Sequence, residues 1–182
     1  MSLENIELLN QAFRPLSLTP EQHSKFYKIW EEVEVPKFTF LTKEGQVERY
    51  FYVVKKGVQC VYLIDREGNK KIIGFSFDGS FSGIYDSFMK ETPSFYFLET
   101  LTDSVMLRVN LENFEALFTK YPEFEHWGRV VHMELLIGRV QREVELTTKT
   151  AKERFEIFMN RCPDQLLQIP QKYLASYLNM TP

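Results

Sequence analysis

Cysteine and histidine, the residues that most often bind metals or act in catalysis, are few and widely spaced in this sequence. The two cysteines, Cys60 and Cys162, form no CxxC pair, so neither an iron–sulfur cluster nor a structural zinc site is predicted. Three histidines, His23, His126 and His132, could ligate a haem by residue type alone. His126 and His132 stand six positions apart on one expected helix and do not share a face. We therefore expect no metal and no cofactor.

Short catalytic motifs are not found either. The sequence contains no GxSxG elbow, no HExxH pair and no GxxxxGK[ST] loop. The carboxylates Glu31, Glu32 and Glu34 stand close together, but they precede Pro36 and are expected at a helix end. The remaining enzymatic alternative is a cupin-like barrel enzyme, which needs histidine ligands on its barrel strands. Because residues 35–109 contain no histidine, we predict no catalytic residue and no enzymatic activity.

Composition and charge set the general class of the protein. The 182 residues are 44% hydrophobic, enough for a packed core, and the 15% of aromatic residues favour a sheet. The net charge is −3, yet basic side chains outnumber acidic ones from His126 onward, which permits a polyanionic partner at that end. No apolar run approaches the roughly 20 residues of a membrane helix, and the start is unlike a signal peptide. We expect a cytoplasmic protein that does not enter the membrane.

The chain begins with helices and continues with strands. Residues Ser2–Phe13 have the spacing of a short amphipathic helix, and Thr19 with Gln22 forms a capping box for a helix that runs to about Trp30. From Val35 to Val109 the pattern is that of short strands separated by glycine turns, which is typical of a barrel or jelly roll. The strands are expected at residues 35–41, 50–54, 58–64, 71–77, 94–100 and 105–109.

The second half is helical. Asn110 can cap a helix that runs to about Lys120, and a long helix is predicted from Pro122 to about Thr148. A further helix, opened by a capping box at Thr150, is expected to end at Cys162. The fold class is therefore α+β.

The long helix carries two apolar stripes. One repeats in steps of three and four residues, the spacing of a coiled-coil seam, and consists of Val130, Met133, Ile137, Val140 and Val144. The other consists of Phe124, Trp127, Val131 and Leu135 and is expected to face the chain's own barrel. We predict that the first stripe packs against the same helix of a second copy to form a homodimer. The alternative is a core helix within a single chain.

The last residues suggest the beginning of a helix-turn-helix. Pro170 suits the start of a helix whose inner face carries Leu174 and Leu178. Asn179 tolerates a left-handed turn position, and Thr181–Pro182 reads as the cap and first position of a following helix. We expect a helix-turn-helix that is cut short at the C-terminus, before its recognition helix.

The order of these parts resembles the Crp/Fnr family of bacterial transcription regulators. Glycines fall where the sensor barrels of that family turn, at Gly45, Gly57, Gly68, Gly79 and Gly83. Phe97–Leu107 is similar to the strand pair after the family's ligand cassette, and Ile169–Pro182 to its first helix-turn-helix helix. The resemblance implies a double-stranded β-helix (jelly-roll) sensor domain of the cyclic-nucleotide-binding type over residues 1–121, a dimerisation helix over residues 122–148 and a partial winged-helix or helix-turn-helix domain over residues 149–182.

The segment that matches the family's ligand cassette, Gly79–Phe95, departs from the family pattern. In cyclic-AMP-binding members a Glu binds the ribose and a following Arg pairs with the cyclic phosphate. The position that matches the Glu is Ile84, the position that matches the Arg is Ser94 or Pro93, and Lys90 is expected to point to solvent. We therefore predict that the barrel does not bind cyclic AMP in the family manner and that its effector, if it has one, is another small molecule. A pocket would be lined by Phe81, Gly83, Ile84, Tyr85, Ser94 and Phe95, and the alternative is that these residues only fill the barrel.

The function that the resemblance implies is DNA-binding transcription regulation. Gln171, Lys172 and Tyr173 are the candidates for contacts with the DNA backbone. Because side chains near the start of a recognition helix read the bases, this chain is expected to dimerise but to bind DNA weakly or not at all. The alternative is a sensor module that acts through protein partners without touching DNA.

Overall fold

The computed structural model describes residues 1–14, 16–162 and 166–180. The elements follow one another in this order: α1 (Leu3–Ala12), α2 (Pro20–Lys28), β1 (Glu31–Val35), β2 (Phe40–Thr42), β3 (Tyr50–Lys56), β4 (Gln59–Ile64), β5 (Lys70–Ser76), β6 (Phe81–Ser82), α3 (Tyr85–Lys90), β7 (Phe97–Thr100), β8 (Ser104–Asn110), α4 (Leu111–Lys120), α5 (Pro122–Thr148), α6 (Ala151–Arg161), the 3-10 helix η1 (Leu166–Gln168) and α7 (Gln171–Tyr177).

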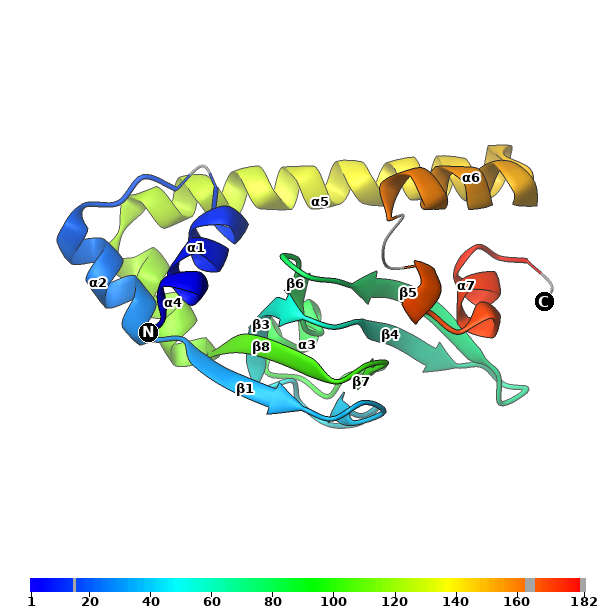
Figure 1. Cartoon of the computed structure of the whole chain (residues 1–182), viewed down its shortest axis with the longest axis horizontal. Coiled ribbons are helices and arrows are strands. Elements are labelled where there is room, and N and C mark those ends of the chain that lie inside the picture. The colour runs from blue at the N-terminus through cyan, green and yellow to red at the C-terminus, as the bar shows by residue number, and fades with distance from the viewer. Residues whose placement is uncertain (15, 163–165, 181–182) are drawn as a thin grey trace.

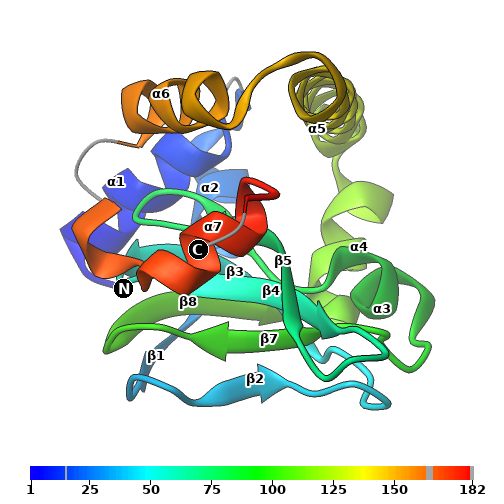
Figure 2. The same cartoon turned by 90° about the vertical axis from the view of Figure 1, so that its right-hand side faces the viewer.

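The strands form a β-roll of two antiparallel four-stranded sheets (Figures 1 and 2). One sheet has the order β1-β8-β3-β6 and the other the order β2-β7-β4-β5. Because side chains alternate between the two faces of a strand, every second residue points into the roll. The interior is closed by apolar side chains from both sheets and from Ile84, just before α3: Tyr52, Val54, Ile84, Leu98 and Met106.

Helices cover the outer face of the β3–β8 sheet. Phe13, at the end of α1, is in the centre of this layer, and its ring stacks on Trp127 of α5 with 4.5 Å between centroids. It also meets Phe26, Trp30 and Phe81 edge to face at 5.0–5.6 Å. Each fully buried ring of this kind contributes about 1.5–3 kcal/mol by removal from water, and aromatic pairs add to that. This cluster fixes the first turns of α5 to the β-roll.

Helix α5 continues well past that cluster. Its 27 residues span about 40 Å at 1.5 Å per residue, and Figure 1 shows its far half extending beyond α1 and α2. The chain then turns, and α6 extends away from the end of α5 (Figure 2), with an ion pair between Arg161 and Glu145 at 2.5 Å joining the two helices. Within the described ranges, no helix combines the length and the apolar character that crossing a membrane requires.

The last helix returns to the β-roll. Figure 2 shows α7 lying beside β5 and β4. Phe158 of α6 and Leu174 and Leu178 of α7 are buried against Cys60 and Ile72 of this sheet. The C-terminal helices therefore complete the core on the outer face of the β4–β5 pair.

Several expectations from the sequence are confirmed. The capping boxes at Thr19 and Thr150 are both formed, and the Asn110 side chain caps α4. The long helix runs from Pro122 to Thr148 as predicted. Asn179 has the expected left-handed conformation, with φ of 52°. The antiparallel β-roll is also confirmed, whereas the cap predicted at Thr181–Pro182 lies outside the described residues.

Other expectations are wrong. Glu31, Glu32 and Glu34 lie on strand β1 and not at a helix end, because the strand pairs with β8 along its whole length. The single strand predicted for residues 35–41 is split into β1 and β2 by a turn in which Phe38 has φ of 57°. The strand predicted from residue 94 begins only at residue 97.

Gly57, directly after β3, gives a direct test of this packing. Its φ is +113°, and a Cβ there would collide with the Ser104 hydroxyl and lie 2.9 Å from the Asp103 carbonyl oxygen. We expect Gly57→Ala to lower the free energy of unfolding by about 2–4 kcal/mol, measured by urea denaturation, because it adds left-handed strain to a steric clash.

The control is Gly74→Ala on β5, where a Cβ would have no atom within 4 Å. This change should alter the free energy of unfolding by no more than about 1 kcal/mol. Equal losses in the two variants would contradict the account of the turn at Gly57.

Candidate functional site

The segment that corresponds to the ligand cassette is built as a tight turn followed by a short helix. Gly83 joins β6 to α3 with φ of +134°, and a Cβ at this position would lie 3.4 Å from the Tyr50 carbonyl oxygen. No side chain caps α3, and Glu91 ends it in the left-handed conformation. The start of α3 therefore presents backbone N–H groups toward the loop before β3.

A carboxylate of the chain itself accepts from one backbone N–H group at this turn. Glu48 is only 2% exposed, and its Oε2 lies 3.4 Å from the backbone nitrogen of Ile84, which donates to it. Its Oε1 accepts from the backbone N–H groups of Arg49, at 3.0 Å, and Tyr50, at 3.3 Å. The Glu48 backbone N–H in turn donates to the Ser87 hydroxyl at 2.9 Å. An internal anion thus lies at the turn where the family resemblance places a ligand.

The environment of Glu48 makes its charged form less favourable. Burial raises the pKa of the Glu48 carboxyl group, and the hydrogen bonds that it accepts offset only part of that rise. Sequence reasoning missed this residue, because a single glutamate between a turn and a strand has no spacing pattern that marks it as buried.

The six residues predicted to line a pocket lie in different surroundings. Phe81 packs in the aromatic layer between Phe51, at 5.1 Å, and Trp127, at 5.8 Å, whereas Ile84 belongs to the interior of the β-roll. Gly83 forms the turn. Ser94 is buried, and its hydroxyl makes hydrogen bonds with the backbone of Tyr96.

The other two predicted residues lie toward the outside of the molecule. Phe95 is 74% exposed, and Tyr85 faces α5. The structure therefore does not gather the six residues around one cavity. Lys90 is exposed, as expected.

Tyr85 links the cassette segment to α5. Its hydroxyl lies 2.8 Å from Nε2 of His132, whose Nδ1 lies 2.6 Å from the Gly128 carbonyl oxygen. Because a carbonyl oxygen can only accept, Nδ1 carries the proton, and in the neutral ring Nε2 accepts from the tyrosine hydroxyl. This contact joins α3 to α5, and it could not be predicted from the sequence because 47 positions separate the two residues.

The residues predicted to form the dimer seam lie along one side of α5. Met133, Ile137, Val140 and Val144 are each about half exposed, at 48–52%, and Val130 is partly buried. The second stripe divides: Phe124 and Trp127 are buried in the aromatic layer, whereas Leu135, expected against the barrel, is 57% exposed. The exposed seam belongs to the half of α5 that extends past the aromatic layer.

Metal binding has no support in the part of the chain that the structure describes. In those residues, no three or more His, Cys, Asp or Glu side chains come close enough to share an ion. His23 stacks on Tyr27, and His126 lies 3.1 Å from Arg129. Each histidine is thus explained by a local contact.

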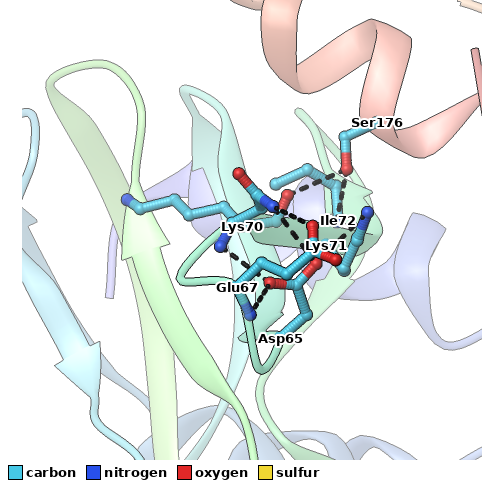
Figure 3. A network of polar contacts seen from close by, with 7 residues as sticks. Asp65, Glu67, Lys70, Lys71, Ile72 and Ser176 are labelled. Atoms are coloured by element: carbon cyan, nitrogen blue, oxygen red, sulfur yellow. Dashed lines mark hydrogen bonds and ion pairs between the residues drawn. The ribbon is translucent and has the colours of Figure 1, made fainter. Parts of the chain in front are cut away.

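The residues predicted to contact DNA lie on α7. Gln171 and Lys172 are exposed, and Tyr173 is partly buried beneath Lys70, whose Nζ lies 5.2 Å from the ring centre. On the next turn the Ser176 hydroxyl accepts from the Ile72 N–H at 3.1 Å and donates to the Lys70 carbonyl oxygen at 3.0 Å. Figure 3 shows Ser176 reaching the backbone of β5 next to the Asp65 turn. The helix is thus docked on the sensor sheet.

The β-roll corresponds to a known family model. Residues 32–121 match the family described as "Cyclic nucleotide-binding domain". No curated protein matches the sequence. This match covers just under half of the chain and agrees with the predicted type of sensor domain.

Solved structures share the fold at low sequence identity. FixK2 from Bradyrhizobium japonicum is 19% identical with a TM-score of 0.70, over 84% of this chain and 79% of that chain. The Catabolite Activator Protein of Thermus thermophilus is 17% identical with a TM-score of 0.62, over 94% and 81%. The sensor domain of the transcriptional regulator DNR from Pseudomonas aeruginosa is 19% identical with a TM-score of 0.61, over 80% and 96%. At these identities the likeness concerns the fold alone.

The burial of the Glu48 carboxyl group can be tested through the pH dependence of stability. A carboxyl group whose pKa is higher in the folded than in the unfolded state binds more protons when folded. Its contribution to stability is therefore present at low pH and is lost as the pH rises from about 4.3, the unfolded value, through the folded pKa. Glu48→Gln removes this loss, so the difference in melting temperature, variant minus wild type, should increase between about pH 4 and pH 7.

Thermal unfolding followed by circular dichroism measures that difference. Glu44→Gln is the matched control, because Glu44 is exposed in the same loop, and its difference from wild type should stay nearly constant over this range. A constant difference for Glu48→Gln would show that the carboxylate is not held in a buried site.

Proposed function

We propose that this chain is the sensing and dimerising part of a cytoplasmic DNA-binding transcription regulator of the Crp/Fnr type, without enzymatic activity. The observation that carries the proposal is the exposed seam on α5. One end of this helix is anchored to the β-roll, and the other carries half-exposed aliphatic side chains at heptad spacing. Such a helix is suited to pair with the same helix of a second copy. The cyclic nucleotide-binding domain over residues 32–121 supports the sensing role.

We further propose that cyclic AMP is not the effector. A cyclic phosphate requires a guanidinium and backbone N–H donors, and the cassette has Ser94 and Ile84 where the family resemblance implies Arg and Glu. The N–H of Ile84 already donates to the Glu48 carboxylate, and that carboxylate would repel a phosphate brought beside it.

The dimer can be tested by placing charge on the seam. We expect Ile137→Glu combined with Val140→Glu to weaken dimerisation at least 100-fold, because each copy contributes the altered seam and burying each aliphatic side chain contributes about 1.5–3 kcal/mol. Sedimentation velocity over a concentration series measures this change.

Leu135→Glu is the matched control, since Leu135 is equally exposed on α5 but lies outside the seam. It should leave the dimer intact. A wild-type chain that sediments as a monomer at high concentration would overturn the dimer proposal.

Cyclic AMP and cyclic GMP can be titrated into the whole chain by isothermal calorimetry. We expect no saturable heat at micromolar nucleotide, because the phosphate would lack its guanidinium partner. Micromolar affinity for either nucleotide would contradict the proposal on the effector.

A second candidate function is a sensor that acts through protein partners without binding DNA. The docking of α7 on β5 favours it, because Ser176 and Tyr173 are already engaged by the β-roll.

A DNA-binding assay separates the two candidates. If α7 contacts phosphates, the chain should bind duplex DNA weakly at about 50 mM salt, and Lys172→Ala should reduce the slope of log affinity against log salt by about 1. Lys37→Ala, at the turn between β1 and β2, should leave the slope unchanged. Failure to detect any salt-dependent binding would favour the second candidate.

A further inference from the structure

The junction between α5, α6, α7 and β5 encloses a cavity that none of the roles above uses. It has a volume of about 240 Å³ and is lined by three arginines, Arg142 from α5 and Arg154 and Arg161 from α6, with a single carboxylate, Glu145. The lining therefore has an excess of positive charge. The three guanidinium groups differ in the hydrogen bonds that they make within the protein.

Two of the arginines make several hydrogen bonds to partners within the protein. Arg154 donates from Nε to the Leu178 carbonyl oxygen at 2.8 Å, from Nη1 to that of Lys149 at 2.5 Å, and from Nη2 to that of Asn179 at 3.1 Å. Arg161 makes a forked ion pair with Glu145, at 2.5 and 3.2 Å. These groups hold the end of α7 and join α6 to α5, so they have a structural explanation.

Arg142 makes a single hydrogen bond within the described residues. Its guanidinium lies over the Tyr177 ring, 3.6 Å from the centre, and Nη2 donates to the Tyr177 carbonyl oxygen at 2.8 Å. A guanidinium has five N–H donors. Among the residues that the structure describes, no carboxylate forms an ion pair with Arg142, and burial lowers the pKa of its guanidinium group. Arg142 is thus a partly exposed cation whose charge is compensated only in part, because Glu145, the carboxylate of the cavity, forms its ion pair with Arg161.

The rest of the lining is mostly apolar and includes four aromatic side chains. Tyr177 lies 5.2 Å from Phe75 and 5.6 Å from Phe158, measured between ring centres. Phe158 is buried, so this wall is rigid. The volume is below the range of about 300–1,000 Å³ that accommodates drug-sized ligands. The cavity fits a molecule with an apolar body and one anionic group.

We infer that this cavity binds a small aromatic carboxylate, whose carboxylate group is held by Arg142 and whose ring packs against Phe75, Phe158 and Tyr177. The site lies between the β-roll and the C-terminal helices, so an occupant would contact β5, α5, α6 and α7 together. Binding to the docked arrangement alone would stabilise it. That the bound acid acts as an effector rests on the proposed function, whereas that the cavity binds such an acid does not.

The first test compares acids with their neutral amides on the wild-type chain. Phenylacetate and benzoate are titrated by isothermal calorimetry against phenylacetamide and benzamide, which have nearly the same shape. We expect the better acid to bind with a Kd below about 1 mM and its amide at least tenfold more weakly, because a charge-assisted forked hydrogen bond is lost. Equal binding of acid and amide, or no binding of either acid at about 10 mM, would overturn the inference.

The second test identifies the residue. Arg142→Gln should weaken phenylacetate binding at least tenfold, whereas Arg139→Gln, at an exposed position one turn earlier on α5, should leave it unchanged. Melting curves check that both variants fold, and if Arg142→Gln does not, the comparison of acid with amide still decides. Unchanged affinity in a folded Arg142→Gln variant would refute the assignment. Sedimentation as a monomer would refute the proposed dimer and leave these titrations valid.

Discussion

The stacking of Phe13 on Trp127 is the contact on which the rest of the arrangement depends. It joins the first helix of the chain to the long helix α5, and Phe26, Trp30 and Phe81 close around it over the β3–β8 sheet. Because these rings anchor only the first turns of α5, the remaining turns extend from a fixed base. The direction of that extension sets where the exposed seam lies and where α6 and α7 can return to the β-roll.

The cassette and the C-terminal helices show two ways of compensating buried charge. Glu48 is an anion that receives backbone N–H groups of its own chain, so the turn before α3 is satisfied without a ligand. Arg142 is a cation whose partners within the described residues are one carbonyl oxygen and an aromatic ring. The same β-roll thus combines a closed polar site at one end with an incompletely compensated one at the other. This contrast makes the junction with the C-terminal helices better suited than the cassette to bind an effector.

Local signals in the sequence predicted the elements well and their mutual contacts poorly. Thr19, Asn110 and Thr150 act through neighbours three positions away, so their capping could be read directly from the sequence. Glu31–Glu34 looked like a solvated helix end, since only the pairing with β8, more than 70 positions later, makes them a strand. The burial of Glu48 and the contact of Tyr85 with His132 depend likewise on residues distant in sequence. Ser176, 106 positions from Lys70, is the extreme case.

The contact between Ser176 and β5 also bears on how the protein avoids self-association. Strand β5 is the last in its sheet, and an unpaired outer strand is a template onto which another chain can add by backbone hydrogen bonding. The serine hydroxyl takes the N–H of Ile72 and the carbonyl of Lys70, the groups that such an intruding strand would use. Helix α7 therefore covers this edge of the sheet, and its displacement would expose these backbone groups to pairing with another strand.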